Sequence, residues 1–177
     1  SPIPVTVMDG RNNSMGLGWQ VIAAARAREA GGGMAEMLAA AEMVRERMVY
    51  YISLDTITYL SKGGRISDAI KFLDSVIQIK PLINVKPESG TVGAGMPARS
   101  RSGAIEGLYK QFFRHIPPGK PLHIVVLHNN ALEEAEALAE RVRQEYQPVE
   151  MFITIVSPVL GVHTGPRAIA LCGYAED

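Results

Sequence analysis

Apolar residues recur at helical spacing in the first third of the chain. The first helix is predicted from Gly16 to Arg28, because Leu17, Val21, Ala24, Ala25 and Arg28 follow a spacing of three to four residues. Three consecutive glycines at 31–33 end this helix. A second set predicts another helix and comprises Met34, Leu38, Ala41 and Met48. Such a methionine-rich face is typical of core packing, although methionine also suits a pliable apolar cavity.

Continuous apolar runs predict strands. The first run is VTVM at 5–8, and Asp9 and Gly10 follow it as a strand-to-loop transition. A buried parallel strand needs neighbours and none precedes this one, so we expect the sequence to begin within a domain. The next run, YYISL at 50–54, predicts a short strand. Asp55 is expected to cap a brief helix that ends at Leu60.

The rest of the chain alternates between the two patterns. A helix is predicted after Arg65, then a hairpin from IKPLINV and TVGAGMPA at 79–98, then a helix at 102–113. The run LHIVVLH at 122–128 predicts a buried strand. Asn130 and Glu133 resemble a capping box for a helix that reaches Tyr146. Buried strands are predicted again at 151–158 and 168–175.

Strand–helix–strand order in the last third predicts an α/β fold with helices layered on a sheet. We expect a domain boundary near residues 50–53. This divides the chain into 1–52, the remnant of an amino-terminal α/β domain with a parallel sheet, and 53–177, a larger carboxy-terminal α/β domain.

Composition narrows the classes of function. Hydrophobic residues make up 47% of the 177 residues, which is enough for a sizeable core. Eighteen basic residues balance eighteen acidic ones without a basic run, which argues against nucleic acid as the main partner. Cys172 is the only cysteine, which excludes an internal disulfide and suits a cytoplasmic location. No apolar run is long enough to span a membrane, and the start of the sequence lacks the pattern of a signal peptide.

The segment YLSKGGRIS places Gly63 and Gly64 directly before Arg65. Glycines allow a ligand to approach the backbone closely, and N–H groups at a helix start attract anions. The Arg65 guanidinium is a planar fork suited to a carboxylate or a phosphate. The alternative is a tight turn beside a surface arginine, because the full phosphate-loop pattern is absent.

A second candidate loop is SPVLGVHTGP at 157–166. His163 follows a predicted buried strand, where α/β proteins often place functional residues. A histidine there can donate a hydrogen bond to an anion or act as a general acid or base. The alternative is a histidine that anchors its own loop. The other histidines, His115, His123 and His128, lack the spacing of a metal site and are expected to be structural.

Two further segments carry candidate chemistry. Arg99 and Arg101 alternate at the end of an extended segment, so at most one of them faces a given pocket; a solvated pair is the alternative. DGRNNSMGLG places Ser14 among glycines between a strand and a helix, and lone glycine spacings of this kind are weak evidence of a nucleotide loop.

Together, YLSKGGRIS, IKPLINV with its hairpin, AR before a helix and SPVLGVHTGP resemble the DegV family of bacterial fatty-acid-binding proteins. The segment VTVMDGRNNSMGLG is similar to that family's V-x-D-S-x-x-x-S-x-G-x-G. The resemblance covers essentially the whole chain. It implies a two-domain α/β protein that holds one long-chain fatty acid, such as palmitate, in a buried tunnel, with the carboxylate near the domain junction.

The resemblance also implies roles for individual residues. Arg65 and His163 would lie at the fatty-acid head group, and Ser14, Gly63, Gly64 and Thr164 would supply loop contacts. Some family members are the acyl-carrying subunit of a fatty acid kinase, so such a kinase is an implied partner, with Arg99 in the coupling to it. No cofactor or metal is implied.

The sequence departs from the family pattern in three places. Gly10 replaces the usual serine after Asp9, and Arg167 stands where glycine is usual. The family's hydroxyl-rich segments, Thr-Ser-x-Pro-Ser and Ser-Gly-x-Ser-Gly, do not occur here. We therefore expect half of the head-group site to be missing from this chain.

Two hypotheses follow. The first is a non-enzymatic lipid carrier whose kinase chemistry belongs to a partner. The second is a phosphotransferase or hydrolase that uses His163 as general acid or base and Arg65 for anion stabilisation. The sequence favours the carrier, because a phosphate loop with lysine, a paired-carboxylate metal site and an evident nucleophile are all missing from it.

Overall fold

The structure, a computed structural model, describes residues 3–64 and 79–176. Its helices are α1 (Ser14–Glu29), α2 (Met34–Arg47), α3 (Thr58–Lys62), α4 (Arg101–Phe113), α5 (Leu132–Tyr146) and α6 (Pro158–Thr164). Its strands are β1 (Val49–Ser53), β2 (Leu82–Val85), β3 (Val92–Ala94), β4 (Leu122–His128), β5 (Glu150–Ile155) and β6 (Ile169–Ala175). The predicted mixed α/β fold class is confirmed.

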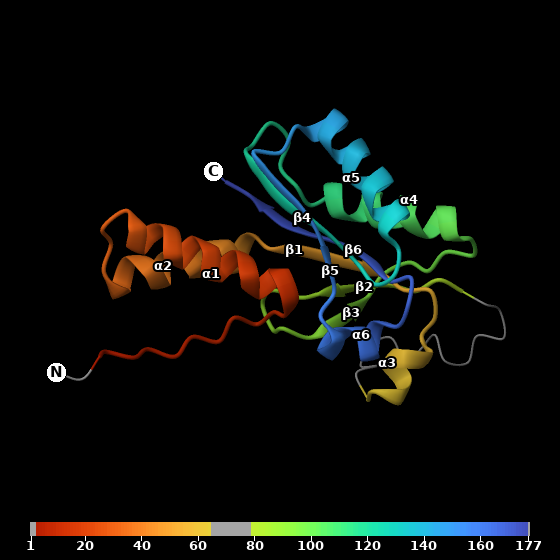
Figure 1. Ribbon diagram of the computed structural model, residues 1–177, viewed down its shortest axis with the longest axis horizontal. Coiled ribbons are helices and arrows are strands. Elements are labelled where there is room, and N and C mark those ends of the chain that lie inside the picture. Colours follow the sequence, from red (N-terminus) through yellow and green to blue (C-terminus); the bar gives the residue numbers. More distant parts are fainter. Residues whose placement is uncertain (1–2, 65–78, 177) are drawn as a thin grey trace.

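Within the described residues, the strands form a single mixed sheet in the order β3-β2-β1-β6-β4-β5 (Figure 1). The predicted hairpin is present as the antiparallel pair β2–β3. β4 and β5 are parallel and are joined by α5, as the strand–helix–strand pattern predicted. The remaining neighbours pair antiparallel. The strand order places β1 and β6 in the middle of the sheet.

Two cores lie on opposite faces of this sheet, because successive side chains of a strand point to opposite sides. On one face Ala170, Cys172 and Tyr174 of β6 pack with Trp19 of α1. On the other face Ile169 and Leu171 pack with residues of α4 and α5. Figure 1 shows α4 and α5 on one side, with α1, α2, α3 and α6 on the other.

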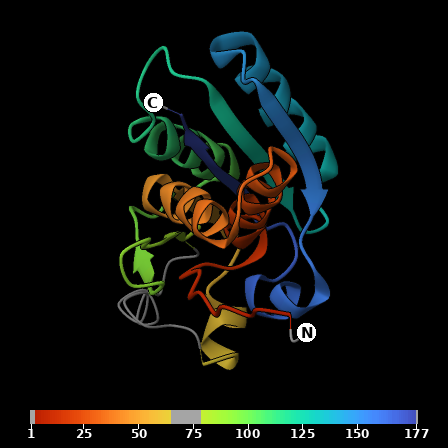
Figure 2. The same ribbon diagram turned by 90° about the vertical axis from the view of Figure 1, so that its left-hand side faces the viewer.

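The predicted strand at residues 5–8 is wrong. These residues are extended but pair with no strand of the described chain, and Val5 and Val7 are 84% and 92% exposed. Figures 1 and 2 show this segment running beside α1 and α2 instead of joining the sheet. An apolar run becomes a strand only where a neighbour pairs its backbone groups. Contacts such as that of Arg45 Nη1 with the Asp9 carbonyl, 2.9 Å, tie the segment to α2 instead.

The strand predicted at 151–158 exists as β5, but it is not buried. It lies at an edge of the sheet, where Phe152 and Ile155 are 40% and 65% exposed. Met151 and Ile153 point to the other face and pack against the α4–α5 core. A hydrophobic run cannot tell an edge strand from a central one, because both alternate in the same way.

The two predicted helix caps are also wrong. Asp55 does not cap α3; its carboxylate accepts from Lys80 Nζ at 2.8 Å. Asn130 does not cap α5, whose first residue follows Ala131, because Asn130 adopts a left-handed φ of 52°. The Ala131 N–H points instead to Nδ1 of His128, 3.4 Å away. Short polar side chains near a helix start have several backbone partners available, so spacing alone does not select one.

The helix predicted after Arg65 lies outside the described residues. Of the helices in 3–64 and 79–176, none has both the length and the apolar character to cross a membrane. The division into 1–52 and 53–177 stays a prediction; its boundary falls within β1, which pairs with β2 and β6.

Candidate functional site

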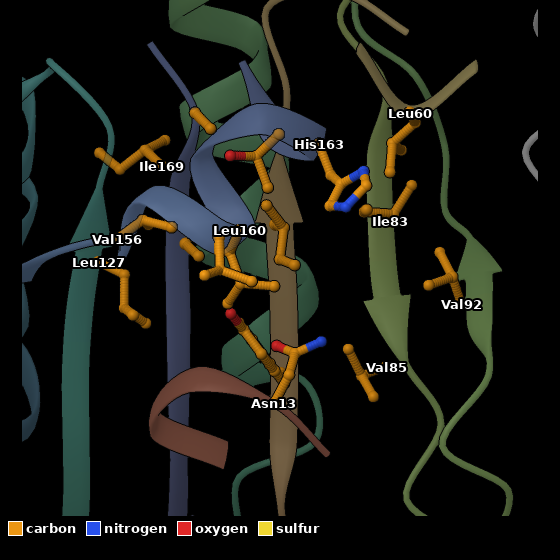
Figure 3. Close-up of a pocket in the computed structure, with 16 residues that line it drawn as sticks. Asn13, Leu60, Ile83, Val85, Val92, Leu127, Val156, Leu160, His163 and Ile169 are labelled. Atoms are coloured by element: carbon orange, nitrogen blue, oxygen red, sulfur yellow. The ribbon is translucent and has the colours of Figure 1, made fainter. Parts of the chain in front are cut away.

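A cavity of about 310 Å³ lies on the α1 face of the sheet, where α6 adjoins it (Figure 3). Ligand pockets in proteins occupy roughly 300–1,000 Å³, so this cavity has room for a small or slender molecule. Its walls are formed by Asn13, Tyr50, Ile52, Leu60, Ile83, Val85, Val92, Leu127, Val156, Val159, Leu160, His163, Thr164, Ala168, Ile169 and Ala170. Most of these side chains are apolar.

The floor of the cavity follows from strand alternation. Tyr50 and Ile52 are two residues apart on β1, and Ile83 and Val85 are two residues apart on β2. Each pair therefore points to the same face of the sheet. Ala170 of β6 has only a methyl group on this face, which leaves space above the middle of the sheet. The alternation of the sequence thus builds a mostly apolar floor, in which the Tyr50 hydroxyl is the one polar side-chain group among these residues.

The α6 segment carries His163 to one end of this cavity. Pro158 is the first residue of α6, a position where its missing N–H costs no hydrogen bond. Gly165 ends the helix with a φ of 72°, and a Cβ there would collide with the Tyr59 ring. Asn129 Nδ2 donates to the Gly165 carbonyl at 2.7 Å, which ties the end of α6 to the loop after β4.

Two buried polar atoms at the α6 end have no hydrogen-bond partner in the described chain. They are Nδ1 of His163 and Oγ1 of Thr164. Leaving a buried polar group unpaired costs about 1–3 kcal/mol, so such atoms commonly mark a place for water or for a ligand. An anion or a hydroxyl at this end could pair with either atom.

The glycine pair of YLSKGG packs against this same end. Gly63 ends α3, and a Cβ at Gly63 would collide with Nδ1 of His163. Gly64 has a φ of 67°, which is strained for residues with a side chain. The two motifs that sequence analysis singled out separately, Gly63-Gly64 and His163-Thr164, are therefore in contact. Arg65 itself lies outside the described residues.

A second polar group lies at the opposite end of the cavity. Oδ1 of Asn13 is buried and unpaired among the described residues, and the Tyr50 hydroxyl lines the cavity and bonds the Ser14 side chain. Ser14 has a φ of 46°, a left-handed conformation that costs a non-glycine residue about 1–2 kcal/mol. Burial raises the pKa of Tyr50 above its ordinary value of 10, so its hydroxyl is neutral at physiological pH.

The described lining residues include no carboxylate, ammonium or guanidinium group. The described part of the chain also holds no group of three His, Cys, Asp or Glu residues arranged to bind a metal. What this arrangement offers chemically is an apolar slot with hydrogen-bonding groups at both ends.

The two candidate arginines near α4 do not line the cavity. Arg99 is exposed just before α4. Arg101 forms a bidentate pair with Glu134 of α5 at 2.8 and 2.7 Å, and Arg167 adds a contact of 3.3 Å to the same carboxylate. Arg101, and more weakly Arg167, lower the pKa of Glu134. Arg101 therefore joins α4 to α5, whereas Arg99 remains available at the surface.

The remaining histidines make hydrogen bonds within the fold. His115 Nδ1 lies 2.8 Å from the Gln111 carbonyl one turn earlier. His123 is buried between Glu150 and Glu176, with 2.8 Å to each carboxylate. His128 is buried at the start of the loop to α5.

Sequence reasoning missed Asn13 and Tyr50 as cavity residues. Asn13 belongs to DGRNNSMGLG, in which the glycines and Ser14 drew attention instead. Tyr50 was assigned to a strand without regard to its face. The spacing of two residues between Tyr50 and Ile52 predicts that both side chains point to the same face of the strand. It does not predict that this face lines a cavity, because that depends on where the helices pack on the sheet.

A family model described as "Uncharacterised protein, DegV family" matches residues 1–176. The chain is 31% identical to a DegV domain-containing protein of Clostridium acetobutylicum over 97% of this chain and 59% of the relative. Two solved structures are also similar. One, titled for the fatty acid binding of a DegV family protein from Thermus thermophilus, has a TM-score of 0.90 and 29% identity, over 99% of this chain and 62% of that one.

The second is DegV of Bacillus subtilis, titled a fatty acid binding protein, with a TM-score of 0.77 and 25% identity. The match covers 90% of this chain and 56% of that one. The sequence given therefore spans about three fifths of the length of these relatives. Arg167, where the family resemblance places glycine, has a φ of 62°, the left-handed region that glycine favours.

Proposed function

Because the chain belongs to the DegV family, we propose that it binds a single long-chain fatty acid, such as palmitate, in the cavity described above. The observation that carries the proposal is the apolar cavity with unpaired polar atoms at its α6 end. Solved relatives from Thermus thermophilus and Bacillus subtilis are titled as fatty-acid-binding proteins, which supports the same class of ligand.

The energetics suit a carrier that needs no catalysis. Burial of each methylene gains about 0.8 kcal/mol, so ten buried methylenes gain about 8 kcal/mol. Part of this gain offsets the lost freedom of the ligand, and polar contacts at the carboxylate add to the remainder. An apolar slot without a charged residue among its described walls suits the acyl chain rather than a sugar or a nucleotide.

In this proposal the carboxylate lies at the α6 end. His163 donates to it, Thr164 offers a hydroxyl, and Arg65 supplies the positive charge. Gly63 allows the close approach of α3 to the histidine ring, since a side chain there would occupy the same space. The head group would then lie near the junction of residues 1–52 and 53–177.

The test is to purify the chain from a bacterial host and measure bound lipid by native mass spectrometry and by extraction. We expect one fatty acid per chain, and displacement or loading by added palmitate. The absence of a bound acid, even after incubation with excess palmitate, would contradict the proposal. Turnover of an acyl or phosphoryl substrate by the chain alone, lost in His163→Ala, would favour an enzyme instead.

A titration of the purified chain with palmitate tests where the head group lies. A hydrogen bond to a charged group contributes about 1.5–3 kcal/mol, so His163→Ala should weaken palmitate binding about 10- to 100-fold. His115→Ala, which removes an exposed histidine outside the cavity, serves as the matched control and should leave affinity unchanged. Palmitate methyl ester should bind both variants equally, because it lacks the carboxylate. Equal losses for acid and ester in His163→Ala would argue for a structural role of the ring.

We also propose that a fatty acid kinase is the partner, that the phosphoryl chemistry belongs to it, and that Arg99 contacts it. Arg99 is exposed and lies outside the cavity, so Arg99→Ala should leave palmitate binding intact and lower acyl phosphate formation by an added kinase at least 10-fold. Arg114→Ala, an exposed arginine at the other end of α4, is the control. A loss of palmitate binding in Arg99→Ala would contradict this role.

A further inference from the structure

A simple saturated fatty acid offers no hydrogen-bond partner to the polar group at the Asn13 end of the cavity. Oδ1 of Asn13 is buried and has no hydrogen-bond partner in residues 3–64 and 79–176. Figure 3 shows Asn13 and His163 at separate ends of the cavity, with Leu160 between them and Ile83 and Val85 along the side. The terminal methyl group of a saturated chain that reached Asn13 would cover this oxygen without bonding to it.

The local backbone places the Asn13 amide in the cavity instead of on the helix. Asn13 is the residue that precedes α1, where an asparagine side chain ordinarily accepts a hydrogen bond from the first turn. Here it makes no such bond. The neighbouring Asn12 Oδ1 instead accepts from the Asn13 N–H at 3.0 Å.

Two further features hold this arrangement. Ser14 keeps a left-handed φ of 46° directly after Asn13. Buried Gln20 donates from Nε2 to the carbonyls of Gly10 and Gly16, 2.9 and 2.8 Å away, and so joins the loop to α1. Strained residues that are held by their surroundings cluster at ligand-binding sites. The loop therefore lacks the usual helix cap and contains a strained residue, and it places the Asn13 amide, whose Oδ1 is buried and unpaired among the described residues, in the wall of the cavity.

We propose that the ligand is a hydroxylated fatty acid, whose carboxylate lies at the His163 end and whose chain hydroxyl bonds the Asn13 amide. A hydroxyl both donates and accepts, so it can pair with either end of the amide. The Tyr50 hydroxyl, neutral and bonded to Ser14, is the second polar group at this end. This inference rests on the proposed function and specifies the substrate class of the same site.

The expected discrimination is substantial. A site that hydrogen-bonds a ligand hydroxyl disfavours the analogue without it, because its own polar group is then left unpaired. We expect the best-placed hydroxyl to improve affinity at least 10-fold over the unsubstituted acid, a difference of about 1.4 kcal/mol.

The experiment compares hexadecanoate with a series of monohydroxyhexadecanoates that differ in hydroxyl position, by calorimetric titration of the purified chain. At least one positional isomer should bind 10-fold or more tightly than hexadecanoate. In Asn13→Leu this advantage should disappear, while hexadecanoate binds as well as before or better. Asn84→Leu makes the same chemical change on β2 at a residue that does not line this cavity, and should keep the advantage.

Asn13→Ser gives an independent test should Asn13→Leu fail to fold, because serine is a good helix cap but lacks the amide. It too should lose the preference for the hydroxylated acid. If hexadecanoate binds and every hydroxylated isomer binds no more tightly, this inference is wrong and the proposed function stands. If neither class of acid binds, the proposed function itself fails. An advantage that survives in both Asn13 variants would overturn the assignment to Asn13.

Discussion

Leu160→Trp should weaken palmitate binding about 100-fold or more. Leu160 lies on α6 and projects into the cavity between the Asn13 and His163 ends (Figure 3). An indole ring at this position would occupy space that the acyl chain needs. Displacing four methylenes removes about 3 kcal/mol of burial, which corresponds to roughly a 100-fold rise in the dissociation constant. Calorimetric titration or displacement of a fluorescent fatty acid measures this change.

The matched control for this variant is Val162→Trp. Val162 lies on the same short helix, is 65% exposed and does not line the cavity. It should bind palmitate with unchanged affinity. The thermal unfolding midpoints of the two variants should be similar, since Leu160 is only partly buried and the added ring enters a space that is already open. Unchanged affinity in Leu160→Trp would place the ligand outside this cavity.

The sequence predicted the central elements well, because their patterns depend on local contacts. The run at 122–128 is buried on both faces and becomes β4, every residue of which is buried. The set of apolar residues within 132–146 has helical spacing and becomes α5, whose buried residues include Leu138 and Val142. In both elements the residues that are buried in the structure belong to the run or to the set of apolar residues that predicted the element.

The errors arose where tertiary neighbours decide the outcome. Val5 and Val7 have the sequence of a strand, but the described chain offers them no pairing partner. Phe152 has the sequence of a core residue, but β5 lies at the edge of the sheet. Neither the partner of a strand nor its place in a sheet is encoded within the strand itself, so single-segment reasoning cannot supply it.

The candidate site shows the same division. The motifs around Gly63 and His163 could be identified from sequence, and the structure explains their glycines through contacts of Gly63 with His163 and of Gly165 with Tyr59. Asn13 could not be identified from sequence. An asparagine before a helix is expected to cap that helix, and only the structure shows that the Asn13 side chain makes no capping hydrogen bond. Only the position of α1 on the sheet brings its amide to the cavity.

That position depends on Trp19, which anchors the middle of α1 against the sheet. Trp19 is fully buried, and its Nε1 donates to the Cys172 carbonyl of β6 at 3.3 Å. Its ring also contacts Phe152, with 5.4 Å between centroids, and Tyr174, with 5.9 Å. One side chain therefore joins α1 to β5 and β6.

Trp19→Ala should be among the most destabilising single substitutions in the described chain. Truncation of a buried tryptophan to alanine costs about 3–5 kcal/mol, a large part of the roughly 5–15 kcal/mol that stabilises a typical domain. For a chain of this size the unfolding midpoint should fall by about 6–20 °C, which thermal denaturation monitored by circular dichroism will measure.

Two controls separate the contributions of Trp19. Trp19→Phe keeps an aromatic ring but loses the bond to the Cys172 carbonyl, so it should cost less than Trp19→Ala. Val21→Ala changes a residue of the same helix that is 60% exposed, and should shift stability by no more than about 0.5 kcal/mol. Below its unfolding midpoint, Trp19→Ala should also bind palmitate less tightly, because a loosened α1 no longer keeps the apolar wall of the cavity closed around the acyl chain. A midpoint within 2 °C of the parent chain would show that α1 is held by other contacts, and that Trp19 does not determine the shape of the site.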